Sequence, residues 1–150
     1  MPTPFESAQL NLHLFDLCRE AVLRDARAWF LDEFNPESFA ELAGLAGGER
    51  NPWFRMVLGY WDMAASLVTA GAIDAPAFLA AHGEIYLTFA KLEPFLAELR
   101  AATKEPAFCW HVEHVVMGSP NAADILMRRR AAAIAAAKRR GSVSSPPAVG

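Results

Sequence analysis

Residues 51–74, with the sequence NPWFRMVLGYWDMAASLVTAGAID, decide the fold class. Asn51-Pro52 is typical of a helix start, because a capping residue is followed by proline at the first helical position. Apolar side chains then recur at helical spacing: Trp53, Met56, Val57, Tyr60, Ala64, Leu67 and Val68. Gly71 fits the left-handed position that ends a helix, and Asp74 fits the N-cap of another. The stretch therefore predicts a helical hairpin.

The N-terminal part predicts one long helix from Ser7, as its N-cap, to about Phe34. Asn35-Pro36 ends it, because the residue before a proline avoids helical dihedral angles. Two apolar rows follow helical spacing: Leu10, Leu14, Leu17, Ala21, Ala28 and Leu31, and beside them Phe15, Cys18, Val22 and Trp29. So wide an apolar arc predicts a helix at the centre of a bundle.

The remaining helical patterns cover residues 36–45, 75–102, 106–117 and 121–140. The second of these is interrupted at His82-Gly83 and kinked at Pro94. No segment alternates with period two between turn signals, as a strand would. We therefore predict an all-α, single-domain bundle of five or six helices over residues 7–140, with a long N-terminal helix. Residues 1–6 and 141–150 are expected to be disordered.

Composition indicates a stable cytoplasmic domain. The chain has 150 residues, of which 53% are hydrophobic, so one core can form without disulfides. The two cysteines, Cys18 and Cys109, lie in apolar helical patterns and are expected to be free, buried thiols of a reducing compartment. The N-terminus lacks a signal-peptide pattern, and no apolar run approaches the ~18 residues of a membrane span.

Charge is unevenly distributed along the chain. Residues 1–124 hold all 17 acidic side chains and 8 of the 14 basic ones, whereas residues 125–150 hold the other six cations and no acid. Those six are candidate contacts to an anionic partner: Arg128, Arg129, Arg130, Lys138, Arg139 and Arg140. The pattern has three interpretations. In the first, the cations interact favourably with the dipole of their own helix and with the acidic body of the protein. In the second they contact an anionic membrane, and in the third they contact nucleic acid.

The densest group of potential metal ligands is Cys109, His111, Glu113 and His114, of which Cys109, His111 and His114 are the candidate ligands. On a helix, residues 109 and 111 diverge by about 200°, so ordinary packing and hydrogen bonds are favoured over a metal site. The sequence has no Gly-x-Ser-x-Gly nucleophile elbow, no phosphate-binding glycine loop and no Glu-x-x-His repeat. We therefore expect no catalytic site, no metal and no cofactor.

Three functions are compatible with this pattern. The surplus of apolar and aromatic residues favours a protein-interaction module that binds a protein partner or self-associates. The first alternative is a sensor for a small molecule or lipid, with an apolar pocket between the Trp53 helix and the first helix. The second alternative is contact with an anionic membrane or nucleic acid through the basic C-terminal helix.

Three motifs carry a family resemblance. They are Leu14-Phe15-Asp16-Leu17-Cys18-Arg19-Glu20 with Ala26-Arg27-x-Trp29-Phe30, then Gly59-Tyr60 … Leu67-Val68 … Gly71-Ala72-Ile73-Asp74, then Leu92-x-Pro94-Phe95 … Leu99-Arg100. Over about residues 7–101 the chain resembles an uncharacterised family of bacterial all-helical proteins, a domain of unknown function. The resemblance implies a helical fold and supplies no site residues.

Overall fold

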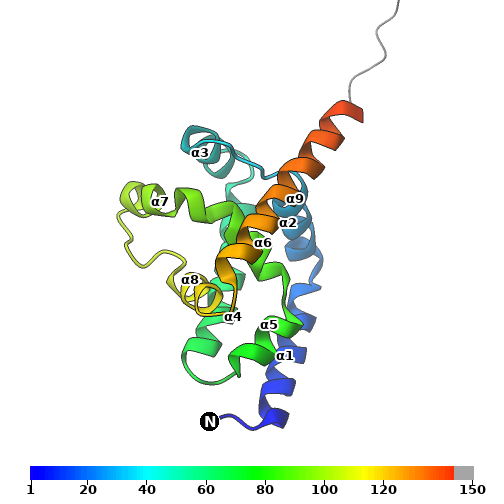
Figure 1. The fold of residues 1–150 in the computed structure, drawn as a ribbon, viewed down its shortest axis with the longest axis vertical. Helices are drawn as coiled ribbons and strands as arrows, with labels where there is room; N and C mark the ends of the chain where they lie inside the picture. The colour runs from blue at the N-terminus through cyan, green and yellow to red at the C-terminus, as the bar shows by residue number, and fades with distance from the viewer. Residues whose placement is uncertain (144–150) are drawn as a thin grey trace, which may run out of the picture.

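The computed structural model describes residues 1–143, with helix α4 running through the middle of the fold (Figure 1). Every regular element in this range is helical, so the all-α prediction is confirmed. The elements are α1 (Pro4–Cys18), α2 (Ala21–Asp32), α3 (Phe39–Gly47), α4 (Asn51–Thr69), α5 (Ala75–Ala81), α6 (Glu84–Leu92), the 3-10 helix η1 (Glu93–Phe95), α7 (Leu96–Thr103), α8 (Trp110–Met117) and α9 (Ala122–Val143).

The predicted number of five or six helices is wrong, because turns divide several of the expected helices. The C-terminal boundary also differs from the prediction. Residues 141–143, expected to be disordered, are helical and form the end of α9. The rest of the predicted tail, residues 144–150, lies outside the described residues.

Helix α1 starts at Pro4, earlier than the start expected at Ser7. Thr3 is its N-cap: the Thr3 hydroxyl accepts a hydrogen bond from the Glu6 amide at 3.2 Å, and the Glu6 carboxylate accepts one from the Thr3 amide at 2.8 Å. This reciprocal pair satisfies two backbone donors at the helix start. The N-terminus predicted to be disordered, residues 1–6, therefore contains the cap and first turn of α1.

The predicted long helix to Phe34 is in fact two helices, with a break at Arg19-Glu20. The Glu20 carboxylate accepts hydrogen bonds from the amides of Val22 at 3.1 Å and Leu23 at 2.8 Å. A side chain that satisfies free amides in this way favours a new helix start over continuation of the old helix. The apolar spacing runs through the break, which is why it predicted a single helix.

Side chains of α2 and α4 bind the C-terminal carbonyl groups of α1. Arg27 Nη1 donates to the Cys18 carbonyl oxygen at 2.8 Å, and the buried Tyr60 hydroxyl donates to the Leu14 carbonyl oxygen at 2.6 Å. Arg27 also forms an ion pair with Glu84 of α6, in which Nε donates to Oε1 at 2.9 Å. These contacts fix the direction of α1 relative to the rest of the fold.

Helix α4, rather than the N-terminal helix, is the central element. It packs extensively against both α2 and α8, and its buried side chains are Phe54, Val57, Leu58, Tyr60, Trp61, Ala64 and Ala65. In the rows predicted for the N-terminal helix, Leu14 is buried, but Phe15, Leu17 and Val22 are exposed. The apolar residues of the N-terminal part are thus divided between the core and the surface.

A cluster of aromatic rings fills the space between α2 and α4. Phe30 and Phe34 stack with their ring centroids 4.7 Å apart, and Phe54 lies 5.5 Å from Phe34 and 6.4 Å from Phe30. Trp29 extends the cluster to Trp53, with centroids 6.4 Å apart. The prediction that an apolar pocket lies between the Trp53 helix and the first helix is therefore wrong in its location, because aromatic side chains occupy that space.

Boundaries predicted from turn residues are largely confirmed. Gly71 has a φ of 79°, a left-handed conformation that suits glycine at a helix end. The Asp74 carboxylate caps α5 by accepting a hydrogen bond from the Ala77 amide at 3.0 Å. The chain also leaves regular α-helix at His82-Gly83 and around Pro94, as expected.

Two helices start later than the sequence predicts. Helix α3 starts at Phe39 instead of Pro36, and α8 starts at Trp110 instead of Pro106. The second difference has a clear physical cause. Lys104 and Cys109 have φ angles of 58° and 55°, so left-handed residues stand at both ends of the segment between α7 and α8. Such residues interrupt a helix, and the preceding segment forms turns.

Candidate functional site

The side chains of Cys109, His111 and His114 do not converge on one point, and each has its own surroundings. Cys109 is buried at the end of the turn segment before α8. The His111 Nδ1 atom lies 2.8 Å from the Thr69 hydroxyl, and the His114 ring stacks on Trp110 at a centroid distance of 4.8 Å. Within residues 1–143, no group of three or more His, Cys, Asp or Glu side chains is placed to hold a metal ion.

The thiol of Cys109 is expected to be unreactive in the folded protein. Burial raises the pKa of Cys109 to about 12, and the nearby Asp62 carboxylate adds to the increase. Because the thiolate is the nucleophile, alkylation by iodoacetamide at about pH 8 should be at least ~100-fold slower than in the unfolded chain. Peptide mass spectrometry over time would measure the modification of Cys109 separately from that of Cys18. Rapid modification of native Cys109 would contradict the burial of its side chain.

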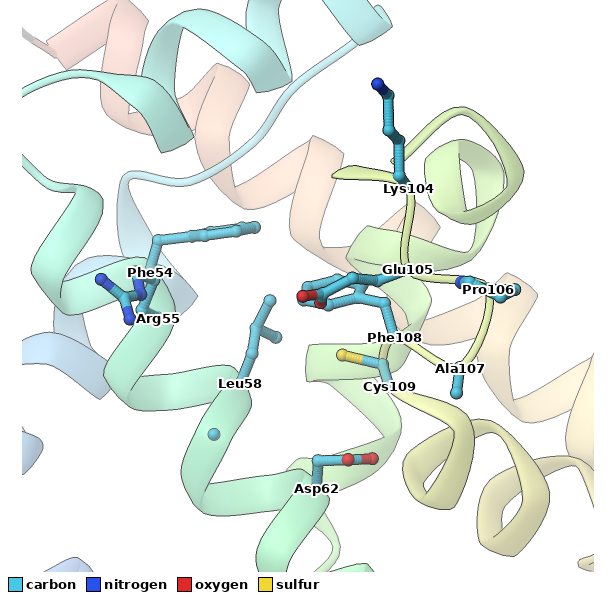
Figure 2. Close-up of a pocket in the computed structure, with 11 residues that line it drawn as sticks. Phe54, Arg55, Leu58, Asp62, Lys104, Glu105, Pro106, Ala107, Phe108 and Cys109 are labelled. Carbon is cyan, nitrogen blue, oxygen red and sulfur yellow. The ribbon is translucent and has the colours of Figure 1, made fainter. Parts of the chain in front are cut away.

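A groove lies between α4 and the turn segment that leads into α8 (Figure 2). It has a volume of about 570 Å³, and Phe54, Leu58 and Phe108 present apolar side chains to it, while Lys104 points away. Gly59 leaves further space, because a Cβ atom built there would meet no atom within 4 Å. The groove could receive an apolar group. No local sequence pattern indicates this groove, because its two walls are far apart in the chain.

Asp62, a charged residue of this groove, has a structural partner. Asp62 Oδ1 accepts a hydrogen bond from the Val112 amide at 3.1 Å, which satisfies a donor in the first turn of α8. Arg100 also holds this segment: its Nε donates to the Phe108 carbonyl oxygen at 3.0 Å, and its Nη1 lies 3.2 Å from the Glu113 carboxylate. These contacts explain how a segment with two left-handed residues keeps its shape.

Two of the six C-terminal cations contact the body of the protein. Arg130 Nε donates to the Ala90 carbonyl oxygen at 2.9 Å, and its Nη2 pairs with Glu93 at 2.6 Å. Arg140 Nη2 donates to the Asp32 carbonyl oxygen at 2.7 Å, and its Nη1 lies 3.7 Å from the Asp32 carboxylate. Both contacts lie at the C-terminal end of a helix, where the partial negative charge favours a cation.

The other four cations lie on the outside of α9. Arg128, Arg129, Lys138 and Arg139 are exposed, and none of them is in a salt bridge in the described part of the chain. Arg128 and Arg139 differ by about 20° around the helix axis and therefore share a face, whereas Lys138 lies about 80° away from Arg128. The six candidate contacts thus divide into two docked and four solvent-facing side chains.

Lys91 is a buried cation that the sequence did not single out. Its ammonium group donates to the carbonyl oxygens of Phe30 at 2.8 Å and Leu31 at 2.7 Å, and to Asn35 Oδ1 at 3.0 Å. Burial lowers the pKa of Lys91 to about 8, and the nearby Arg140 contributes to the decrease. Three donors meet three acceptors, so Lys91 joins α6 to the C-terminal end of α2. No spacing rule could have identified this contact, because two of its three partners are backbone carbonyl groups.

A row of apolar side chains covers the outward side of α1. Phe5, Leu12 and Phe15 are 69%, 69% and 52% exposed, and Ala8 lies between them in an exposed position. Their spacing of three, four and three residues keeps them on one side of the helix. We call these four residues the α1 stripe. The opposite side of α1 lies against α5, and Figure 1 shows α1 at the edge of the fold beside that short helix.

The fold and this site define an all-helical protein whose first helix is apolar on two sides. The chain belongs to the family described as Domain of unknown function (DUF4760), whose model matches residues 4–119. This finding confirms the resemblance noted over residues 7–101. A comparison with curated proteins gives no match, and a comparison with solved structures gives none either.

The matched segment begins at the first residue of α1 and ends before α9. The α1 stripe therefore lies inside the family domain, whereas the basic helix α9 lies outside it. No helix in residues 1–143 combines the length and the apolar character that crossing a membrane requires.

Proposed function

We propose that this protein is a protein-interaction module and that the α1 stripe is its binding surface. The observation that supports the proposal is the exposure of Phe5, Leu12 and Phe15 in one row. A contiguous apolar surface in contact with water is unfavourable, and its burial against a partner is the usual compensation. Apolar residues at this spacing bind another helix or an apolar groove.

The contacts of α1 prepare the stripe for binding. The buried Ser7 hydroxyl accepts a hydrogen bond from the Asp74 amide at 3.3 Å, so the N-terminal half of α1 is joined to the start of α5. The contacts from Tyr60 and Arg27 hold the C-terminal half. A helix that is already ordered loses little conformational entropy when it binds a partner.

The two alternative functions have weaker structural support. The groove beside α4 supports binding of a small apolar molecule, but the space first expected to hold that ligand is filled by the aromatic cluster. Contact with an anionic membrane or nucleic acid would rest on four cations, because Arg130 and Arg140 have partners in the body. We therefore place the α1 stripe first and propose no catalytic role.

The cytoplasm is the proposed location of the protein. Cys18 and Cys109 are free thiols, both buried and located on different elements. Free cysteines of this kind are typical of proteins in a reducing compartment.

Site-specific photo-crosslinking would test the binding surface. With a benzophenone amino acid in place of Leu12, illumination of cells should give a covalent adduct with a protein of defined mass. The same group in place of Met127, an exposed apolar residue of α9, is the matched control and should give less of that adduct. The change Phe15→Glu should abolish the adduct from position 12, because it places a charge within the stripe. No adduct above the level of the Met127 control would contradict the proposal.

A further inference from the structure

The α1 stripe has a symmetric order of side chains. Phe5 and Phe15 lie five residues before and after Leu10, and Ala8 and Leu12 lie two residues before and after it. Reading the stripe backward therefore places an aromatic ring opposite an aromatic ring and a small side chain opposite a large one. An interface with two-fold symmetry requires such self-complementarity. If residue i of one copy contacts residue j of the other, then residue j of the first copy also contacts residue i of the second.

We propose that the partner of the α1 stripe is a second copy of this chain, whose α1 pairs with it in antiparallel orientation. The two-fold axis passes near residue 10. This inference rests on the proposed function and adds the identity of the partner. In the pair, Phe5 faces Phe15 of the second copy, and Ala8 faces Leu12 of the second copy.

Packing favours this orientation over a parallel pair. In a parallel pair, two Ala8 methyl groups would face each other next to a layer of two Leu12 side chains, which leaves a gap beside a crowded layer. In the antiparallel pair the two central layers each combine one Ala8 with one Leu12 and therefore have equal volumes, and the two Phe layers can adopt offset or edge-to-face contacts. Antiparallel helices also place opposite ends of their dipoles together.

The size of the stripe indicates a weak dimer. The exposed fractions of Phe5, Leu12 and Phe15 correspond to about 400 Å² of side-chain surface per copy. Two copies would bury about 800 Å², which is below the size of a stable protein interface and in the range of transient complexes. A dissociation constant on the order of 10–100 μM is therefore expected.

Sedimentation equilibrium of the purified chain would test the pairing. Wild-type protein should dimerise with concentration, and Leu12→Lys or Ala8→Glu should each raise the dissociation constant at least ~tenfold, because each change occurs twice in the interface. The matched control Met127→Lys introduces the same charge on α9 and should leave the constant unchanged. All three positions are exposed, so these variants should fold, and thermal melting would verify this.

A mixture of the Ala8→Glu chain and the Leu12→Lys chain would test the orientation. In the antiparallel pair the new carboxylate of one chain faces the new ammonium group of the other, so the mixed dimer should form at lower concentration than either variant alone. Added salt should weaken this preference. In a parallel pair the two charges would not share a layer. Absence of a mixed dimer would therefore overturn the antiparallel orientation.

The two proposals fail in different ways. A wild-type chain that remains monomeric at ~1 mM would overturn the second-copy inference, since even a weak dimer forms at that concentration. If position 12 then still forms an adduct with a different protein in cells, the proposed function stands with another partner. If position 12 gives no adduct and the chain is monomeric, both proposals are wrong.

Discussion

Replacing Lys91 with glutamate is expected to lower the free energy of unfolding by about 3–5 kcal/mol. The Lys91 ammonium group donates to the carbonyl oxygens of Phe30 and Leu31 and to Asn35 Oδ1, and the residue is only 6% exposed. A carboxylate in its place would face three acceptors, one of them a side-chain oxygen. It would also lie at the negative end of the α2 dipole. The nearby Arg140 already forms an ion pair with Asp32 and would compensate only part of the cost of burying this carboxylate.

Urea unfolding of the Lys91→Glu chain, followed by circular dichroism, would measure this loss. Lys138→Glu is the matched control, because it makes the same charge change on the exposed side of α9. The control should change the unfolding free energy by less than about 1 kcal/mol. Equal effects of the two substitutions would show that Lys91 is not part of the contact between α6 and α2.

Phe30→Ala is the other substitution with a large expected effect, about 3–5 kcal/mol of unfolding free energy. Phe30 is fully buried and contacts the rings of Trp29, Phe34 and Phe54. Its removal would leave a cavity between α2 and α4, and Phe54 would lose part of its packing on the side opposite the groove. The loss of unfolding free energy has two parts. One is the hydrophobic transfer free energy of the removed ring atoms, and the other is the free energy of the remaining cavity, because the surrounding helices can only partly close the space.

The same change at an exposed ring provides the comparison for Phe30→Ala. Phe5→Ala removes an equal number of atoms from the outward side of α1, and below the concentration of dimer formation it should cost less than about 1 kcal/mol. Thermal or urea unfolding of both variants in parallel would give the difference. A small effect at Phe30 would mean that the cluster between α2 and α4 repacks around the cavity.

The sequence predicted those parts of the fold that local chemistry determines. Glycine, proline and capping residues act within a few positions of themselves, and so Gly71, Asp74 and Pro94 marked real boundaries. The break at Glu20 was missed although it too is local. A glutamate within a helical pattern is normally an ordinary helix residue, and its capping role became visible only from its two backbone contacts.

The candidate site was less accessible from the sequence. Helical spacing correctly showed that α1 is apolar around much of its circumference, but it could not show that α5 covers one side and that Phe5, Leu12 and Phe15 stay exposed on the other. Spacing reports which residues share a face, whereas exposure depends on where distant elements pack. Likewise, the charge count identified the cations of α9 but not the carbonyl groups that Arg130 and Arg140 bind.

The central position of α4 affects how the chain acquires its structure during synthesis. Helix α2 covers one side of α4, but α8, on the other side, ends at Met117, well after the end of α4 at Thr69. At a synthesis rate of about 5–20 residues per second, α8 follows α4 from the ribosome by roughly 2–10 seconds. During that interval an apolar side of α4 is exposed to water, so the nascent chain should be a substrate for chaperones that bind apolar segments until α8 arrives.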